Sequence, residues 1–262
     1  MNLAALDPGL LGWPLLAGLL VVATHVPLGR RVLARGIIFL DLAIAQIAVL
    51  GVIAAHTFDL APQGWPTQLA AAAAALVGAA ALAGCERRWP DTQEALIGSV
   101  FVAAASLGVL LLAGDPHGGE HLSELLTGQI LWATPEQTAR LGLLYAALMA
   151  VWVWRSTRPS GTGLGALGFY LIFALAITAS VQLVGVYLVF ASLILPALAV
   201  RGRSPRMGLL TGWLLGALAY SAGLAASALF DWPAGPAIVV ALATTALIAG
   251  NMPRLAASTR QR

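Results

Sequence analysis

Residues 36–56, GIIFLDLAIAQIAVLGVIAAH, form an apolar run about as long as a lipid bilayer is thick. A helix rises about 1.5 Å per residue, so this run makes roughly 31 Å of helix, which matches the hydrocarbon core of a membrane. Two strongly polar side chains, Asp41 and Gln46, interrupt it. We therefore predict a transmembrane helix over 36–56.

Asp41 makes this predicted helix a candidate lining of a transport route. An acidic side chain at the bilayer centre costs about 2.5–3.5 kcal/mol on insertion scales, so it normally faces a bundle interior or a polar pathway. The alternative is that Asp41 lies near the membrane face, solvated or paired with Arg35, since only residues 36–40 separate the two. The sequence leaves both placements open.

The composition of the whole chain also indicates a membrane protein. It is 60% hydrophobic and 10% charged, whereas a soluble domain carries about 25% charged residues. We expect an all-α polytopic membrane protein, with a single transmembrane domain over residues 1–262 and no room for a separate soluble domain. About nine spans are predicted, with eight or ten also compatible: 10–28, 36–56, 67–84, 94–113, 138–154, 168–182, 186–200, 207–230 and 236–250.

Two of these spans come from one apolar run at 166–200. As a single helix this run would be roughly 52 Å long, too long for an ordinary bilayer. Gln182 and Gly185 mark the predicted break, and Pro196 is expected to kink the second helix.

The charges predict the orientation of the spans. All 14 basic residues are arginine, and 13 of them lie at the C-terminus or after the first, third, fifth and seventh spans, with Arg140 as the exception. Positive residues on alternate connections are typical of the cytoplasmic side. We therefore expect the N-terminus outside and the C-terminus in the cytoplasm, and we do not attribute the isoelectric point of 9.6 to nucleic-acid binding.

The segment 115–136 is too polar and too rich in Pro and Gly to cross a membrane. We predict a surface loop followed by a short interfacial or re-entrant helix at 121–132, with Trp132 at headgroup level. Its HGGEH sequence, residues 117–121, has the H-x-x-E-H order of inverted zinc peptidases. A peptidase is disfavoured because Gly118 and Gly119 weaken a helix there and no soluble domain supplies a third ligand.

A second interpretation of the same loop is a transient metal-capture site facing outward. His117 and His121 would bind with Glu120 or Glu124, because imidazole and carboxylate suit zinc or manganese. His56, at the outer end of the second span, is placed to join such a site. An ordinary hydrated acidic loop is the competing interpretation.

Other function classes lack their motifs. The chain has no P-loop, so it does not bind ATP by that route. Its single cysteine, Cys85, excludes an internal disulfide and a cysteine-rich metal cage. The two halves of the chain show no obvious internal repeat, and this argues against a single-chain secondary transporter.

Motifs over most of the chain resemble the membrane permease of ABC importers for zinc, manganese and iron. They are PLGRRVLARGIIFLDLAIAQIAVLG at 27–51, EALIGSVFVAAASLGVLLL at 94–112, LLTGQILWATPE at 125–136, VQLVGVYLVFASLILPALA at 181–199 and DWPAGPAIVV at 231–240. The resemblance implies a homodimer or pseudo-dimer of permeases with two cytoplasmic ATPase subunits and an extracytoplasmic metal-binding protein. It implies no catalytic residue and no cofactor in the permease itself.

The chain departs from the family pattern in its second span. The family usually shows G-D-x-x-A-H there, with Asp and His on one helix face in the ion path. Aligned on A-x-x-L-G, the His position is Gln46, the Asp position is Leu42, and Asp41 takes the Gly position. Asp41 therefore points about 100° from the usual direction, and Gln46 offers a weaker zinc ligand than imidazole.

The second departure is cytoplasmic. The family carries D-P-x-x-A-x-x-x-G before its sixth span, where the ATPase docks, and here that place holds only RSTRPSGTGLGALG at 155–168. The arginines on this side are the expected ATPase-coupling residues: Arg155, Arg158, Arg201, Arg203 and Arg206.

The sequence thus predicts the permease subunit of an ABC importer for zinc, manganese or iron in a cytoplasmic (inner) membrane. A separate ATPase subunit would power it, and the predicted metal-contacting residues are Asp41, Gln46, His117, Glu120 and His121. Two alternatives stay open: a secondary metal transporter that works without ATP, and a non-transporting membrane component whose site has degenerated.

Overall fold

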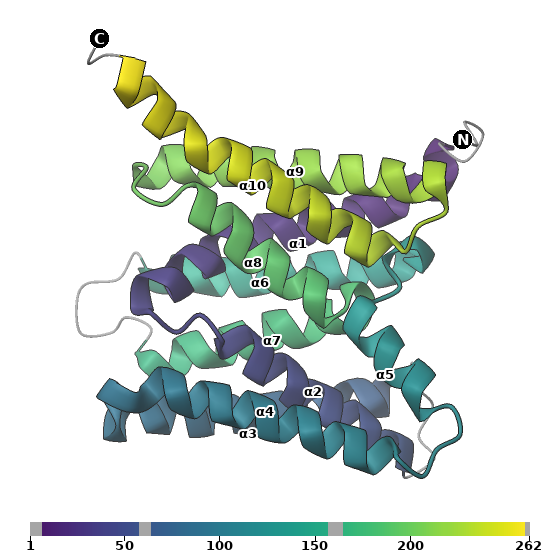
Figure 1. Cartoon of the computed structure of the whole chain (residues 1–262). Helices are drawn as coiled ribbons and strands as arrows, with labels where there is room; N and C mark the ends of the chain where they lie inside the picture. The colour runs from purple at the N-terminus through teal and green to yellow at the C-terminus, as the bar shows by residue number, and fades with distance from the viewer. Residues whose placement is uncertain (1–6, 58–63, 157–164, 260–262) are drawn as a thin grey trace. The chain divides into compact units, whose positions relative to one another are not determined.

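The computed structural model describes residues 7–57, 64–156 and 165–259, and these residues fold into helices alone (Figure 1). The α-helices are α1 (Pro8–Arg35), α2 (Leu40–Thr57), α3 (Trp65–Arg88), α4 (Gln93–Leu112), α5 (Gly118–Thr127), α6 (Pro135–Ser156), α7 (Ala166–Val184), α8 (Val186–Ala199), α9 (Pro205–Phe230) and α10 (Ala234–Thr259). Two short 3-10 helices complete them, η2 (Pro90–Thr92) and η3 (Ile130–Trp132).

The chain divides into two compact units that alternate along the sequence. The first contains Met1–Arg35, Gln129–Arg140 and Tyr187–Arg262, and the second contains Gly36–Gly128 and Leu141–Val186. Neither unit is a continuous stretch, so each core needs segments that lie far apart in the sequence.

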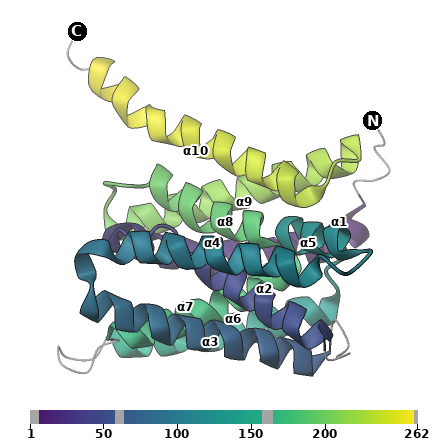
Figure 2. The ribbon, with the colours of Figure 1, turned by 60° about the horizontal axis from the view of Figure 1, so that its bottom comes forward.

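Helix α2 is the centre of the second unit, where it contacts α3, α4 and α7 (Figure 2). Gly51 lies so close to α3 that a Cβ atom built on it would stand 2.7 Å from the Ala70 carbonyl oxygen. Along α3 a buried alanine recurs every four residues, at Ala71, Ala75 and Ala79. Small residues let membrane helices approach closely, which explains why an alanine-rich helix packs against α2.

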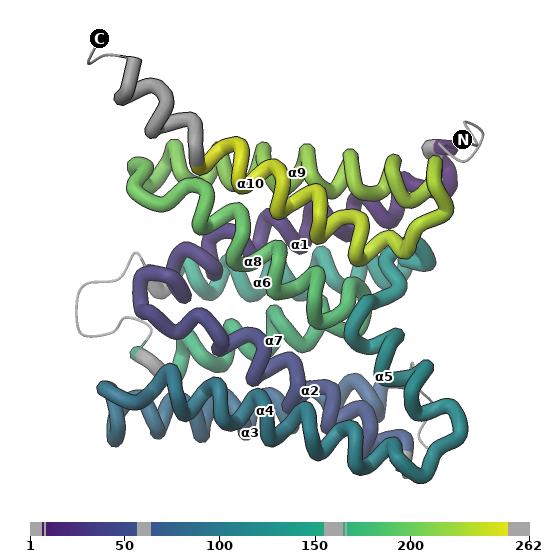
Figure 3. The backbone as a smooth tube through the Cα atoms, viewed as in Figure 1, coloured from purple at the N-terminus to yellow at the C-terminus, as the bar shows by residue number. Residues whose placement is uncertain are grey.

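In the first unit, α9 contacts both α1 and α10. Three glycines spaced by four residues, Gly208, Gly212 and Gly216, face α1, where a Cβ atom on Gly212 would stand 2.7 Å from Val26. The backbone then turns after Phe230 and returns as α10, which packs against α9 (Figure 3). Small residues every four positions are typical of close helix pairs in membranes.

The start of α2 differs from the sequence prediction. A helix over 36–56 was expected, but α1 continues to Arg35, Gly36 has a φ of +73°, and α2 begins at Leu40. A left-handed residue ends a helix because the next turn cannot continue its hydrogen bonds. Asp41 therefore lies in the first turn of α2 and not in its middle.

Other boundaries confirm or adjust the prediction. The break between α7 and α8 falls at Gly185, as expected, and Pro196 lies inside α8. The short helix expected at 121–132 is instead α5, which begins at Gly118, followed by the separate η3. The two glycines therefore open a helix, although glycine was expected to weaken one at this place. A turn precedes α5 and stabilises its start, since the Gly118 N–H donates to the Asp115 carbonyl oxygen at 3.0 Å.

The helices have the length and surface of membrane spans. Within the described residues, five are long and apolar enough to cross a bilayer: Gly9–Arg35, Trp65–Arg88, Pro90–Leu112, Leu167–Val184 and Pro205–Phe230. Shorter apolar helices lie at Leu40–His56, Val186–Ala199 and Ala234–Gly250. Large apolar side chains such as Leu143 and Leu110 are exposed by 76% and 70%, which suits lipid and not water. The chain is a polytopic helical membrane protein; nine spans and their orientation remain predictions.

Candidate metal-translocation site

Helix α2 carries polar groups at both of its ends. Its 18 residues span about 27 Å. Asp41 lies in its first turn and His56 in its last, with Gln46 between them. The residues that can contact a cation in the second unit gather around these two ends.

Asp41 is a buried acid without a hydrogen-bond partner. Its side chain is 1% exposed, and neither carboxylate oxygen has a partner in the described part of the chain. A buried charge is tolerated only with a partner, water or a passing cation. Of the two predicted placements, the structure therefore supports the one in which the Asp41 side chain faces the helix bundle. The residue itself nevertheless lies in the first turn of α2.

Glu94 stands beside the same end of α2. It lies in the first turn of α4, and its Oε1 atom accepts a hydrogen bond from the Phe39 backbone N–H at 3.2 Å. Its Oε2 atom is buried with no partner among the described residues. Glu94 therefore ties α4 to the start of α2 and leaves one carboxylate oxygen available near Asp41.

Gln46 is also buried, at 5% exposure. It follows Asp41 by five residues, which places it about 140° round the helix. The two side chains therefore do not share a face of α2. On α7, which contacts α2, Thr178 Oγ1 and Gln182 Nε2 are buried without a partner among the described residues and stand one helical turn apart.

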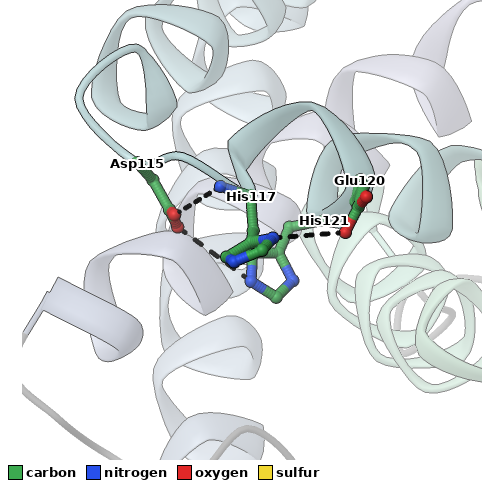
Figure 4. A network of polar contacts seen from close by, with 4 residues as sticks. All are labelled: Asp115, His117, Glu120 and His121. Atoms are coloured by element: carbon green, nitrogen blue, oxygen red, sulfur yellow. Dashed lines mark hydrogen bonds and ion pairs between the residues drawn. The ribbon is translucent and has the colours of Figure 1, made fainter.

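The HGGEH segment forms a polar network with Asp115 (Figure 4). The His117 N–H donates to Asp115 Oδ1 at 2.9 Å, and His121 Nε2 lies 4.0 Å from Asp115 Oδ2. On the other side of His117, its Nδ1 lies 3.4 Å from Glu120 Oε2. His117 and Glu120 are 71% and 81% exposed, whereas His121 and Asp115 are 44% and 34% exposed.

The ring of His56, on α2, lies beside this network. Its ring centroid lies 5.5 Å from that of His121, with the two ring planes inclined by 49°. The predicted partners His117 and His121 are thus not paired with each other: His121 faces His56 and Asp115, and His117 faces Glu120. Within the described residues, no group of three or more His, Cys, Asp or Glu side chains is arranged so that it could hold a metal ion.

A family model matches the sequence of almost all of these helices. The model of the ABC 3 transport family matches residues 9–158 and 162–252. The chain belongs to this family. It is therefore a metal-ion ABC transporter permease, and the predicted family is confirmed.

Curated relatives of this permease are metal transport proteins. One is the manganese transport system membrane protein MntC of Halalkalibacterium halodurans, 26% identical over 247 residues, which cover 88% of this chain and 82% of the relative. Another is the high-affinity zinc uptake system membrane protein ZnuB of Haemophilus influenzae, 24% identical over 244 residues, 86% of this chain and 91% of the relative.

Solved structures share the fold of this permease. PsaBC from Streptococcus pneumoniae in complex with Fab superimposes with a TM-score of 0.72 at 21% identity, covering 92% of this chain and 90% of that chain. An inward-facing putative metal-chelate type ABC transporter superimposes with a TM-score of 0.64 at 16% identity, covering 98% and 90%. At these identities the likeness shows the fold.

The predicted coupling arginines gather in part at one end of the first unit. Arg201 and Arg206 are exposed in and after the turn between α8 and α9, and Arg203 donates to Thr211 Oγ1 at 3.3 Å. Arg30 holds the same turn from α1, because its Nη1 donates to the Pro205 carbonyl oxygen at 2.6 Å. The Arg155 side chain and Arg158 lie outside the described residues.

Sequence reasoning missed several residues of this site. Glu94 is an acidic residue at the start of a predicted span, which could have marked it as a candidate site residue. Nothing in the sequence, however, places it beside Phe39. Asp115 was recognised only as an acid of a loop. Thr178 and Gln182 stand four residues apart within an apolar run, and that spacing places both on one helix face.

Proposed function

We propose that this permease imports zinc, manganese or iron across the cytoplasmic (inner) membrane, powered by a separate ATPase subunit. The observation that carries the proposal is the buried, unpartnered Asp41 carboxylate on α2, the helix against which the second unit is packed. A transported divalent ion satisfies such a carboxylate, which otherwise costs free energy in the membrane. The metal names of the relatives support the same cargo.

In this proposal the ion travels along α2. In the predicted orientation, the His56 end faces outward and the Asp41 end faces the cytoplasm. His117, Glu120 and His121 receive the ion at the outer end, and Gln46 and Asp41 contact it further in. Because Asp41 and Gln46 lie on different faces of one helix, we propose that a homodimer brings two Asp41 side chains to one ion.

Each proposed partner protein would bind the permease on one side of the membrane. An extracytoplasmic metal-binding protein would deliver the ion to the outer end. Cytoplasmic ABC ATPase subunits would dock at the turn that carries Arg201, Arg203 and Arg206, together with the connection that carries Arg155 and Arg158. Both units and the arginine-bearing connections would then act as a single permease domain.

Reconstitution tests this proposal against its two rivals. The permease is placed in liposomes with and without its ATPase, and uptake of Zn²⁺ and Mn²⁺ is followed with an enclosed metal-sensitive dye. We expect uptake only with ATPase and ATP. Equal uptake without the ATPase would identify a secondary transporter, and no uptake under either condition, with the complex intact, would identify a degenerate component.

A further inference from the structure

We propose that a groove between α1 and α9 binds one anionic phospholipid of the surrounding membrane. One acyl chain would lie in the groove, and the phosphate would lie against the guanidinium groups of Arg30 and Arg206. Such a site goes beyond the proposed function, since it needs neither the transported ion nor ATP. All of its residues belong to the first unit.

Helices α1 and α9 pack against each other and run antiparallel (Figure 1). A Cβ atom on Gly18, in the first half of α1, would overlap the ring of Tyr220. A Cβ atom on Gly208, in the first turn of α9, would stand 2.9 Å from Arg30 Nη1. The start of α9 therefore lies against the end of α1.

An apolar groove with a volume of about 270 Å³ lies between these two helices. Its lining includes Leu19, Val22 and Ala23 from α1 and Leu210, Trp213 and Ala217 from α9. The Trp213 indole reaches across to α1, because its Nε1 donates to the Ala23 carbonyl oxygen at 3.3 Å. With that N–H already bonded, the lining is apolar and suits a hydrocarbon chain.

Two arginines stand at one end of the groove. Arg30 follows Ala23 by seven residues, and Arg206 precedes Leu210 by four. Both spacings keep a side chain on the same face of its helix. The Arg30 Nη1 atom donates to the Pro205 carbonyl oxygen at 2.6 Å, so Arg30 is held against the turn of α9 that carries Arg206.

The charge at this end fits an anion. Neither α1 nor residues 187–230 contain an Asp or a Glu. Arginine presents five N–H donors in a planar fork that matches the oxygens of a phosphate. Arg30 is bonded to Pro205 through Nη1, and Arg206 is exposed. Basic pockets between membrane helices bind anionic headgroups through such side chains.

The length of the groove matches one leaflet of a bilayer. Leu19 and Arg30 are eleven residues apart, as are Arg206 and Ala217, and this is roughly 16 Å of helix. The hydrocarbon core is about 30 Å thick, so each leaflet contributes about 15 Å. A lipid with its phosphate at the arginines would therefore extend an acyl chain along the whole groove. Free phosphate has no use for the groove, which is why we assign the site to a phospholipid.

Quenching of tryptophan fluorescence by a brominated lipid tests the site. Purified permease in detergent is titrated with phosphatidylglycerol that carries bromine on its acyl chains. Trp213 lines the groove, and its signal is the difference between the parent protein and Trp213→Phe. We expect saturable quenching, with about tenfold or more higher affinity than for brominated phosphatidylcholine, whose headgroup has no net charge.

Two kinds of variant separate the headgroup from the acyl chain. Arg206→Gln should lower the affinity for phosphatidylglycerol about fivefold, the usual effect of one arginine at an anionic surface. Arg30→Gln should do the same, and its melting temperature is measured as well because it loses the bond to Pro205. Ala217→Phe should lower the affinity for both lipids, because the added ring fills the groove.

Arg31→Gln is the matched control. Arg31 is exposed and directly follows Arg30, so its side chain is turned about 100° round α1. This variant should change the affinity for phosphatidylglycerol by less than about twofold. A second control is Trp232, which lines a larger groove between α9 and α10 whose described lining carries no charge. The signal lost in Trp232→Phe should not distinguish the two lipids.

Equal affinity for the two lipids overturns the proposal, and so does unchanged affinity in Arg206→Gln and Arg30→Gln. Displacement of the brominated lipid by inorganic phosphate, with unchanged binding in Ala217→Phe, would instead identify a site for a free anion. If Ala217→Phe converts a dimer to a monomer on gel filtration and leaves the quenching unchanged, a second copy of the chain covers the groove and the proposal is wrong.

These outcomes are separate from those that test the proposed function. Arg206 is also a proposed docking residue for the ATPase, so the titration contains no ATPase, ATP or metal. A permease that prefers phosphatidylglycerol but imports no metal keeps this lipid site and loses the importer. ATP-driven metal uptake by a permease without this preference does the reverse.

Discussion

In the proposed pathway, Asp41 and Glu94 are the acids that would contact a cation at this end of α2. Both are acids with buried oxygens that lack a partner among the described residues. Glu94 also has a structural task, because its Oε1 atom accepts the Phe39 N–H. The two roles are separable, since glutamine keeps that acceptor but removes the charge.

We expect Asp41→Asn to lower ATP-driven uptake by roughly tenfold or more, because losing one group that acts on a bound metal commonly costs 10–100-fold. Expression and gel-filtration behaviour should change little, since asparagine has the same shape. Gln46→His should be tolerated or should change the ratio of Zn²⁺ to Mn²⁺ uptake, since it restores an imidazole. If Asp41→Asn transports normally while Asp41→Ala only misfolds, the carboxylate is structural.

Glu94→Gln should lower uptake several-fold without loss of thermal stability, whereas Glu94→Ala should also destabilise the protein by about 1 kcal/mol, the usual worth of a hydrogen bond. Uptake is measured in liposomes and stability by thermal melting in detergent. Equal uptake by the glutamine variant and the parent would assign Glu94 to the start of α2 alone.

At the scale of elements, close backbone approach determines the arrangement. Gly128 ends α5 and Gly185 ends α7, with φ values of +73° and +79°, and each is in direct contact with the backbone of the other. A Cβ atom on either would overlap the main chain of the facing element. This contact joins α5, which carries His121, to α7 within the second unit.

Gly185→Ala should therefore destabilise the permease by roughly 2–5 kcal/mol, the sum of a left-handed backbone cost and overpacking. Gly202→Ala is the matched control, because Gly202 has a φ of +84° but open space around it. It should cost only about 1–2 kcal/mol. Melting temperatures in detergent compare the two; equal losses would show that the backbone contact between Gly128 and Gly185 contributes nothing.

At the scale of the whole molecule, the side of the membrane on which each loop between helices lies decides which partner protein it can bind. The predicted orientation places 115–124 outside and the C-terminus in the cytoplasm, from the distribution of arginines. We expect a C-terminal fluorescent reporter to be active in the cytoplasm. A cysteine-free variant, Cys85→Ala, with one cysteine added in 115–124 should react with an impermeant thiol reagent from outside. A C-terminal reporter active only outside would overturn the nine-span topology.

Charge reversal of Arg201 and Arg206 to Glu should lower metal-stimulated ATPase activity of the assembled transporter several-fold and leave the permease folded. Both side chains are exposed, so no internal contact is expected to be lost. Arg140→Glu is the control, since Arg140 pairs with Glu136 on α6 and is predicted to lie on the other side. Unchanged coupling in the Arg201 and Arg206 variants would move the docking surface elsewhere.

Sequence alone determined the helical membrane class, most helix positions and the break at Gly185. These properties depend on the length of apolar runs and on backbone preferences, which are local and can be read along the chain. Local reasoning was weaker at the ends of helices. It began the second helix at residue 36 because residues 36–40 are all apolar or glycine, whereas the structure starts α2 at Leu40, after Gly36.

Tertiary structure alone decided which polar residues meet. His56 and His121 are separated by two predicted spans, and Phe39 and Glu94 by one, so no periodicity relates them. Local reasoning grouped His117 with His121 because they are close in sequence, but α5 turns them toward different partners. A site built from the ends of separate helices depends on how those helices pack, and packing is a property of the fold that single-chain patterns do not contain.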